Sequence, residues 1–418
     1  MEVDFKITID PEEFKNYAGA KINYSNAHTH NSTNFYTVGG FNIQNINLLF
    51  EEKINVQQID CFEFNGIQAF FKIPGSDFPF DIFAATFYLL SRYEEYLPHE
   101  KDMYGRYAYE NSLAYKEGFL KLPLINIWVK EFTKALQDQF PSSNILRKAF
   151  GPKFKFIPTY DIDIAYSYKH KGLLRNTGGF FKSPSIERIK VLAGLKSDPF
   201  DSFDWLHLLH RQYHLQPIYF FLVPEKNGRY DKNILPHKDV MWQLVKQHAK
   251  KYMVGLHPSW QSGDNKSLLK KEKQQLAAMI QAAESVPTLS RQHYIRFNLP
   301  EGYSRLTEAG ITDDYSMGYG SINGFRASVA SSHYWFNLEK GEQTDLRIHP
   351  FCFMDANAYY EQKQTVQQTL DEMIHYLSVC KKVSGTLVTV WHNNFLGTAV
   401  PFKGWKEMYV HFIAQALQ

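Results

Sequence analysis

The sequence predicts an α/β protein: a distorted (β/α) barrel of about seven parallel strands, preceded by a smaller α/β domain. Strand-like and helix-like segments alternate about seven times after residue 154, which indicates a parallel sheet with right-handed crossovers. Two of the strand-like segments, 217–223 and 386–391, are apolar without alternation, as expected for strands buried on both faces. The length of 418 residues suits two domains, or one large barrel with an extension.

Residues 1–150 are predicted to form a separate α/β domain of unknown function, and residues 151–418 to form the barrel. The sequence Pro141-Ser-Ser is typical of a junction between two such parts. Short strand-like runs, polar turns and two helices with an apolar face make up the N-terminal part. The runs are 5–9, 46–50 and 69–73, and the helices start near Asp81 and cover 124–137.

In the barrel part, β-favouring apolar runs predict the strands, and apolar residues at helical spacing predict the helices between them. The helix over 365–380, for example, carries Val366, Leu370 and Met373 on one face. The predicted strands are 154–160, 217–223, 252–256, a short run near 288, 311–316, 346–354 and 386–391. The predicted helices are 203–213, 238–251, 268–280, 301–309 and 365–380, followed by a closing helix.

The composition indicates a protein with a substantial core and no nucleic-acid surface. Hydrophobic residues make up 44% of the chain, charged residues 21%, and the formal net charge is only +3. No run is apolar and long enough to span a membrane, and the acidic start does not resemble a secretory signal. The cysteines and the His28-x-His30 pair lack the spacing of a metal site, so we expect a soluble, cytoplasmic protein in a reducing compartment.

Polar side chains that can bind ligands follow several of the predicted strands. Asp161 and Asp163 come directly after the strand over 154–160, and two such acids repel one another unless a cation or a shared proton separates their roles. Alone, an Asp-x-Asp pair is more often a cap plus a solvated acid, and a lone histidine is more often structural. Together, however, five strand ends converge on one face of a barrel. The other residues are His257, Arg291, His293, Asp314 and His392.

An ordered set of motifs over residues 150–418 resembles the polysaccharide deacetylase family (NodB homology, carbohydrate esterase family four). The chain is similar to a divergent branch of that family with an uncharacterised N-terminal domain. The motifs are Thr159-Tyr-Asp-Ile-Asp163, Gly255-Leu-His-Pro-Ser259, Ser290-Arg-Gln-His293, Asp313-Asp-Tyr-Ser-Met-Gly318, Gly324-Phe-Arg326 and Val390-Trp-His-Asn393. The N-terminal similarity lies in Leu89-Leu-Ser-Arg-Tyr-Glu-Glu95 and Asn111-Ser-Leu-Ala-Tyr-Lys-Glu-Gly118.

The resemblance implies a divalent metal, zinc, held by one Asp and two His residues. By position, Asp163 matches the ligand carboxylate and His257 the first ligand histidine. The family places its second histidine one helical turn later, where this chain has Gln261, and glutamine is a poor zinc ligand. His293, at a neighbouring strand end, is the candidate for the missing imidazole, with a structural or substrate-binding role as the alternative.

The resemblance also implies a division of catalytic roles. Asp161 matches the general base, Arg291 the arginine that orients this base, and His392 the general acid. These residue types suit the chemistry: a metal lowers the pKa of its water and polarises an acetamide oxygen, and an imidazole titrates in the range needed to protonate a leaving amine.

The predicted function is therefore metal-dependent N-deacetylation of an N-acetylated amino sugar or polysaccharide precursor. Substrate contacts are expected from Arg326, Trp260 and Asp314, although loop hydrogen bonding or packing explains such residues equally well. One alternative is a catalytically silent carbohydrate-binding or scaffolding protein with the same fold. Another is a hydrolase of a different ester or phosphate, but the sequence has no glycine-rich loop of the kind that binds phosphate.

Overall fold

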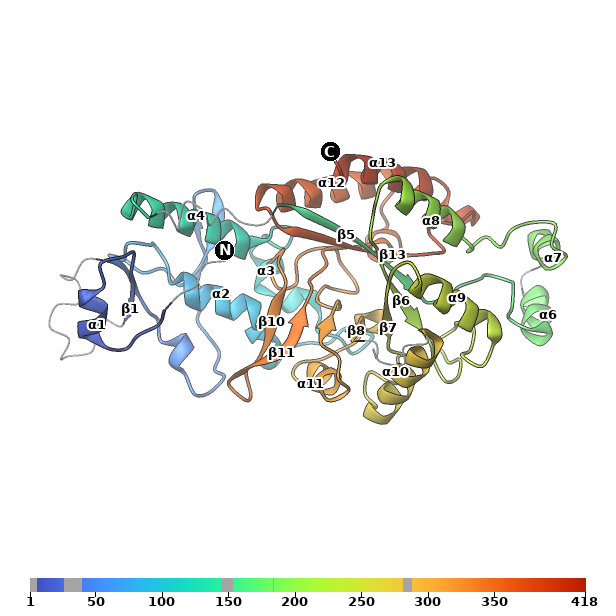
Figure 1. Ribbon diagram of the computed structural model, residues 1–418, viewed down its shortest axis with the longest axis horizontal. Helices are drawn as coiled ribbons and strands as arrows, with labels where there is room; N and C mark the ends of the chain where they lie inside the picture. The colour runs from blue at the N-terminus through green and yellow to red at the C-terminus, as the bar shows by residue number, and fades with distance from the viewer. Residues whose placement is uncertain (1–5, 26–39, 144–152, 183, 281–287) are drawn as a thin grey trace.

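The computed structural model describes residues 6–25, 40–143, 153–182, 184–280 and 288–418, and it has a mixed α/β architecture (Figure 1). Its largest sheet has nine strands in the order β10-β11-β9-β8-β7-β6-β5-β13-β12. Every neighbouring pair in it is parallel except β10 with β11. The strands are β5 (Lys155–Ile162), β6 (Ile218–Leu222), β7 (Met253–His257), β8 (Leu289–Ser290), β9 (Asp313–Asp314), β10 (His333–Asn337), β11 (Glu342–Ile348), β12 (Phe353–Met354) and β13 (Thr386–His392).

Helices follow most of these strands and cover the sheet. In Figure 1, α8, α12 and α13 lie above the sheet, and α9, α10 and α11 lie below or to its right; α6 and α7 stand away from it. The helices of this part are α6 (Leu173–Lys182), α7 (Ile186–Leu192), α8 (Phe203–Gln212), α9 (Asp239–Ala249), α10 (Lys266–Ile280), α11 (Glu301–Glu308), α12 (Val366–Lys382) and α13 (Trp405–Ala416). Shorter helical segments are η5 (His293–Ile295), η6 (Asn357–Glu361) and η7 (Val400–Phe402).

The N-terminal part contains two small sheets and packs beside the large one. Strand β1 (Ile22–Ser25) pairs in parallel with β2 (Phe41–Gln44), and β3 (Phe62–Phe64) pairs with β4 (Ile67–Ala69) as a hairpin. Its helices are α1 (Pro11–Asn16), η2 (Leu48–Phe50), α2 (Ile82–Leu90), η3 (Tyr93–Tyr96), η4 (Tyr109–Asn111), α3 (Leu113–Lys116) and α4 (Leu124–Gln139).

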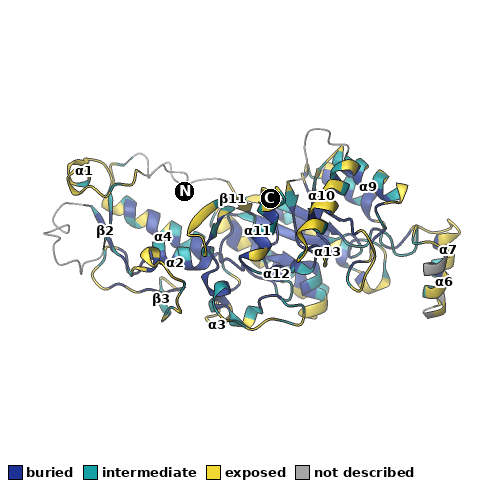
Figure 2. Ribbon diagram, turned by 90° about the horizontal axis from the view of Figure 1, so that it is seen from below, coloured by how far each residue is buried: buried dark blue, intermediate teal, exposed yellow. Residues whose placement is uncertain are grey.

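The large sheet is the centre of the core because its strands are apolar on both faces. All five residues of β6 are buried, and the five C-terminal residues of β5 are buried as well. Figure 2 shows exposed residues along β11 and on the outer faces of the covering helices, whereas the strands inside the sheet are mostly buried. A doubly covered sheet of this kind is what continuous apolar strands require.

The parallel registers bring several strand ends to one edge of the sheet. Asp161 in β5 lies opposite His392 in β13, and Leu222 at the end of β6 lies opposite His257 in β7. Leu256 in turn lies opposite Ser290 in β8, so the segment that follows β8 starts at the same edge. Polar residues that are far apart in the sequence therefore meet there.

The predicted strands of the barrel part are present, with two differences. The predicted strand over 346–354 is two strands, β11 and β12, because Pro350 interrupts the ladder. Strand β10 was not predicted; it forms an antiparallel hairpin with β11 at one edge of the sheet. The sheet thus has more strands than the seven that were predicted, and its closure as a barrel stays a prediction.

The N-terminal predictions were less accurate. The helices near Asp81 and over 124–137 are present as α2 and α4, but the run 46–50 contains the short helix η2 instead of a strand. Of the run 69–73, only Ala69 belongs to a strand. Part of the run 5–9, the His28-x-His30 pair and the predicted boundary at residue 150 lie outside the described residues.

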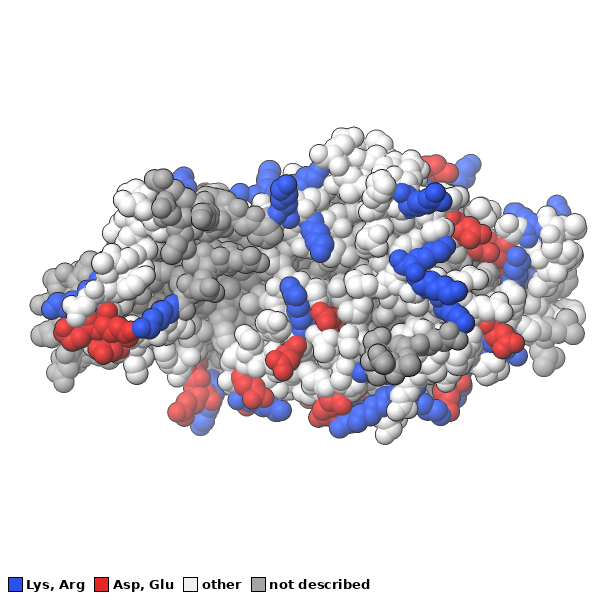
Figure 3. Space-filling view, viewed as in Figure 1, with Lys and Arg blue, Asp and Glu red and all other residues white. Residues whose placement is uncertain are grey.

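The charged side chains are dispersed, in keeping with the small net charge. Lys and Arg are interspersed with Asp and Glu on the face drawn in Figure 3. Within the described residues, no helix combines the length and the apolar character needed to cross a membrane.

Candidate metal centre

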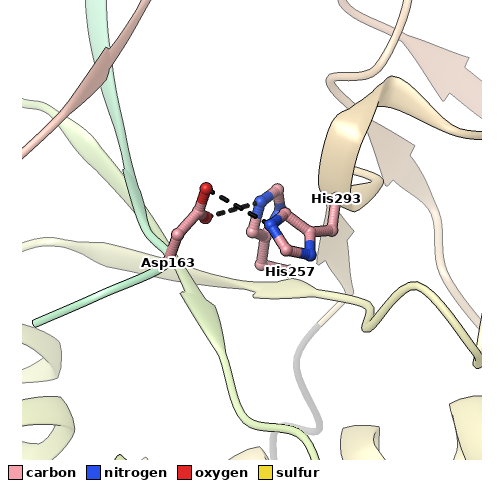
Figure 4. A group of neighbouring side chains, drawn as sticks. All are labelled: Asp163, His257 and His293. Atoms are coloured by element: carbon pink, nitrogen blue, oxygen red, sulfur yellow. Dashed lines mark ion pairs between the residues drawn. The ribbon is translucent and has the colours of Figure 1, made fainter. Parts of the chain in front are cut away.

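Asp163, His257 and His293 converge at the carboxyl edge of the large sheet (Figure 4). One ligand-capable atom from each lies within 4.8 Å of those of the others. Asp163 follows β5, His257 ends β7, and His293 opens η5 after β8. The alternation of side chains along an extended chain places Asp163 on the same side as Asp161 and leaves Ile162 for the core, where it is fully buried.

The distances within this group are short enough for the ligands of one metal ion. His257 Nε2 lies 3.0 Å from Asp163 Oδ1, and His293 Nε2 lies 3.3 Å from Asp163 Oδ2. Two ligand atoms bound tetrahedrally to one zinc ion at about 2.1 Å are separated by about 3.4 Å. The two imidazoles and the carboxylate thus have the spacing of a common coordination sphere.

Each histidine has its second ring nitrogen bound to a fixed acceptor. His257 Nδ1 lies 2.5 Å from the carbonyl oxygen of Arg291, and His293 Nδ1 lies 2.9 Å from Asp231 Oδ1. Both acceptors require a proton on Nδ1, so the lone pair of each neutral ring is on Nε2, toward Asp163. Metal-binding histidines are typically oriented in this way by an outer carbonyl or carboxylate.

Asp163 Oδ1 is the atom that most directly tests whether these residues fit a cation. It is buried and has no hydrogen-bond partner, although His257 Nε2 is close to it. A buried carboxylate oxygen without a donor is costly, by about 1–3 kcal/mol or more. A divalent cation between Asp163, His257 and His293 would satisfy this oxygen, so the residues present fit a metal.

Asp161 is held beside this group by a buried arginine. Arg291 Nη1 donates to Asp161 Oδ1 at 2.8 Å, and Arg291 Nε donates to the carbonyl oxygen of Tyr315 at 3.0 Å. Asp161 Oδ2 lies 3.8 Å from His257 Nε2. One oxygen of Asp161 is therefore fixed by Arg291 and the other is directed toward the candidate centre.

His392 lies on the other side of Asp163. Its Nε2 is 3.4 Å from Asp163 Oδ2, and its Nδ1 is 2.6 Å from Asp355 Oδ1. The backbone N–H of His392 donates to the second oxygen of Asp355 at 2.7 Å. Asp355 thus fixes both the ring and the backbone of His392.

The charges of these groups shift their titration strongly. Burial opposes ionisation of Asp163, but the neighbouring His293, His257 and His392 outweigh it and hold its pKa well below the ordinary value. Burial lowers the pKa of His293, while Asp163 and Asp231 raise it more, to about 9. For His392, Asp355 and Asp163 likewise outweigh burial and raise the pKa well above its usual range. The cluster thus attracts positive charge, as a cation site does.

The structure does not bring the three predicted substrate contacts together. Trp260 is half-buried beside the centre, with its backbone N–H donating to Asp231. Asp314 is fully buried and accepts hydrogen bonds from Ser290 and Ser316.

Arg326 is also buried, and Glu95 binds its guanidinium at Nε and at Nη2. With this side chain only 2% exposed, a contact between Arg326 and substrate has no support in the geometry. Gln261, which occupies the position where the resemblance implies a second histidine, is exposed.

The sequence analysis did not identify the roles of two residues that support the candidate centre. Asp231 lies in the loop after β6, with no motif around it, and orients both His293 and Trp260. Asp355 follows β12 and supports His392. The sequence signal available for both was only that an acid follows a predicted strand.

Comparisons with known proteins give distant likenesses. A family of unknown function (DUF7033) matches residues 1–141. No curated protein matches the chain.

Among solved structures, a protein from Mycobacterium smegmatis assigned as a polysaccharide deacetylase overlaps with a TM-score of 0.41 and 13% identity, over 64% of this chain and 85% of that one. A 4-alpha-glucanotransferase from Thermococcus litoralis has a TM-score of 0.39 and 12% identity, over 64% of this chain and 38% of that one. A polysaccharide deacetylase from Bacillus cereus has a TM-score of 0.33 and 11% identity, over 62% of this chain and 87% of that one. Overlaps this weak do not identify an activity, so the functional argument depends on the side chains of the centre.

Proposed function

We propose that this protein is a metal-dependent N-deacetylase that acts on an N-acetylated amino sugar or polysaccharide precursor. The observation that carries the proposal is the convergence of two histidine Nε2 atoms on the carboxylate of Asp163: His257 lies 3.0 Å from Oδ1 and His293 lies 3.3 Å from Oδ2. Asp161 and His392 lie beside this group, each with its own fixed partner.

The metal ligands in this proposal are Asp163, His257 and His293. One carboxylate and two imidazoles, with room for water and substrate, form an open set of the kind found in catalytic zinc sites, so we propose zinc. Bound there, the metal supplies Lewis-acid polarisation of the acetamide oxygen and lowers the pKa of water.

Asp161 acts as the general base in this proposal. Arg291 holds one of its oxygens, which keeps the carboxylate in place and balances its charge beside Asp163. The other oxygen is free of that contact and can accept the proton of the attacking water. The base and the ligand thus have separate tasks because their environments differ.

His392 acts as the general acid. Asp355 holds its Nδ1 proton and leaves Nε2 facing the centre, where a protonated ring can donate to the departing amine. Asp355 and Asp163 favour this protonated form, since both raise the pKa of His392.

A catalytically silent protein of the same fold would need no such arrangement. That alternative predicts that the side chains of Asp163, His257 and His293 point apart, or that His293 is tied up in the core. The three groups instead face one another: His293 Nδ1 binds Asp231, and its Nε2 is directed to Asp163 at 3.3 Å. This geometry supports the hydrolase over the silent reading.

The proposal is tested by calorimetric titration of zinc into the chelator-stripped protein. We expect one zinc per chain, with affinity weakened at least tenfold in His293→Ala and unchanged in the surface control His411→Ala. Release of acetate from N-acetylated amino sugars and oligosaccharides would then be assayed with the metal-loaded protein. A wild-type protein that binds no zinc would contradict the proposal and favour a silent carbohydrate-binding protein.

A further inference from the structure

A tight turn over residues 102–106 carries a buried arginine from the N-terminal part toward the metal centre. Asp102 Oδ1 accepts hydrogen bonds from the backbone N–H groups of Tyr104 and Arg106, and Asp102 Oδ2 lies 2.6 Å from Arg106 Nε. Gly105 has a φ of +76°, which glycine adopts without strain. The turn therefore fixes the direction of the Arg106 side chain. Arg106 as a whole residue is only 4% exposed.

The guanidinium of Arg106 crosses to the large-sheet part and binds the backbone there. Its Nη1 donates to the carbonyl oxygen of Tyr294 at 2.7 Å. Gly320 leaves the space that this requires, because a Cβ atom at that position would lie 1.9 Å from Arg106 Nη1 and 2.9 Å from the Tyr294 oxygen. The contact is built on both sides, by a fixed donor and by a residue without a side chain.

Tyr294 follows the ligand candidate His293 directly, and its backbone is strained. Its φ and ψ are 59° and 11°, and Ile295 also has a positive φ, of 54°. Left-handed conformations are unfavourable for non-glycine residues and persist only when the surroundings hold them. Arg106 holds the Tyr294 carbonyl, and the ring of Tyr104 packs against the ring of Tyr294 at 5.4 Å.

We propose that Arg106 is a positioning residue for the metal centre: the N-terminal turn locks the strained backbone at Tyr294 and thereby aims His293 at Asp163. The effect of Arg106 on metal binding rests on the proposed function, because His293 is the third metal ligand in that proposal. It assigns to the region of unknown function, residues 1–141, a structural part in the site.

The test uses full-length protein with Arg106→Ala, Arg106→Lys and Gly320→Ala. Arg211→Ala is the control, because Arg211 is an exposed arginine near the C-terminal end of α8, outside the contacts of the 102–106 turn described above. The first readout is amide hydrogen exchange of the metal-free protein over residues 292–297. We expect Arg106→Ala and Gly320→Ala to speed exchange there, at the amides of His293, Ile295 and Arg296, and Arg211→Ala to leave it unchanged.

The second readout is zinc affinity by calorimetry. Arg106→Ala should bind zinc about tenfold more weakly than wild type, in the range for lost outer-shell contacts, and Arg106→Lys should recover part of the loss because it keeps a cationic donor. Unchanged exchange over 292–297 in a folded Arg106→Ala protein would overturn the positioning role. Faster exchange in a protein whose wild type binds no zinc would retain that role and reject the deacetylase proposal instead.

Discussion

Asp161 and Asp163 have different environments although only one residue separates them. Arg291 binds Asp161, whereas His257, His293 and His392 surround Asp163. The extended chain turns both carboxylates to the same side, so they share one site, and His257 Nε2 lies closer to Asp163, at 3.0 Å, than to Asp161, at 3.8 Å. Division of roles between the two acids follows from their neighbours and not from their chemistry.

Removing the charge of Asp161 should stop turnover without releasing the metal. In Asp161→Asn the amide cannot accept a proton from water, while Asp163 and the two histidines are intact. We expect kcat for deacetylation to fall by about 10²–10⁴-fold, the range for loss of a general base. Zinc titration of the same variant should give wild-type stoichiometry; retained activity would reject Asp161 as the base.

A buried glutamate near the centre should make stability depend on pH. Glu272 accepts a hydrogen bond from the backbone N–H of Ser259, and burial raises its pKa from 4.5 to about 7. The folded pKa lies above the unfolded one, so the free energy of unfolding falls as pH rises from about 4.5 to 7 and is lowest above that range.

Glu272→Gln should remove this fall, which is on the order of a few kcal/mol. Urea unfolding at pH 5 and pH 8 would measure this change in the free energy of unfolding. The control is Glu63→Gln, because Glu63 is exposed. If the free energy of unfolding changed equally with pH in the wild type and in Glu272→Gln, Glu272 would be ionised in the folded state throughout the range from pH 5 to pH 8.

The elements that the sequence predicted well are those with a strong pattern. Strand β6 is apolar and buried along its length, and β5, β7 and β13 each contain an apolar run that is largely buried, which indicates strands covered on both faces. The edge strand β10 is only partly buried, and the hairpin with β11 depends on pairing that no local pattern reveals. The same holds for the short strands of the N-terminal part, whose rings pack against one another as much as against the sheets.

At the site, the sequence located the strand-end residues but not their supports. His293 could be named as a ligand candidate because it follows a strand, and the structure places it near Asp163. Asp231 and Asp355 are long-range partners in the chain, and only the folded sheet and its loops bring them to the histidines. The sequence predicted a substrate contact for Arg326 because Glu95, which binds its guanidinium, is 231 positions away in the chain and no local pattern links the two.

Strand β7 contains a glycine that no larger residue can replace without movement. A Cβ atom at Gly255 would lie 2.6 Å from the ring of Phe220 on the neighbouring strand and 3.0 Å from Leu289 Cβ. We expect Gly255→Ala to lower the free energy of unfolding by about 1–3 kcal/mol, the usual cost of overpacking. Gly228→Ala is the matched control, since nothing lies within 4 Å of its Cβ position. Equal denaturant midpoints for the two variants would contradict the close packing.

At the scale of the whole molecule, a buried ion-pair network joins the N-terminal part to the large sheet. Glu95 binds Arg92 within the N-terminal part and Arg326 across the junction, and Arg92 Nη1 also binds the carbonyl oxygen of Arg326. Burial opposes ionisation of Glu95, but Arg326 and Arg92 lower its pKa to about 2. The network is therefore charged at any ordinary pH, and the two parts are expected to fold as one unit.

Breaking this network should be far more costly than breaking a surface pair. Glu95→Ala leaves the buried guanidinium of Arg326 without a carboxylate, whereas Arg92 keeps its pair with Glu94, and we expect a loss of about 3–5 kcal/mol in the free energy of unfolding. The control is Glu308→Ala, which removes the exposed pair of Glu308 with Lys266 and should change little. Chemical denaturation of both variants measures the difference; similar small losses would mean that the junction is held mainly by apolar packing.

The origin of the third ligand candidate affects how such centres can be recognised in other chains. His257 ends β7, and His293 follows the adjacent β8, so the two imidazoles meet through sheet pairing and not through one turn of helix. A search for two histidines at a fixed short spacing would classify this chain as having lost its centre. A search for ligand-capable residues at the ends of neighbouring strands would include this chain. The same search would include related chains in which a ligand comes from the next loop while the ion has the same position.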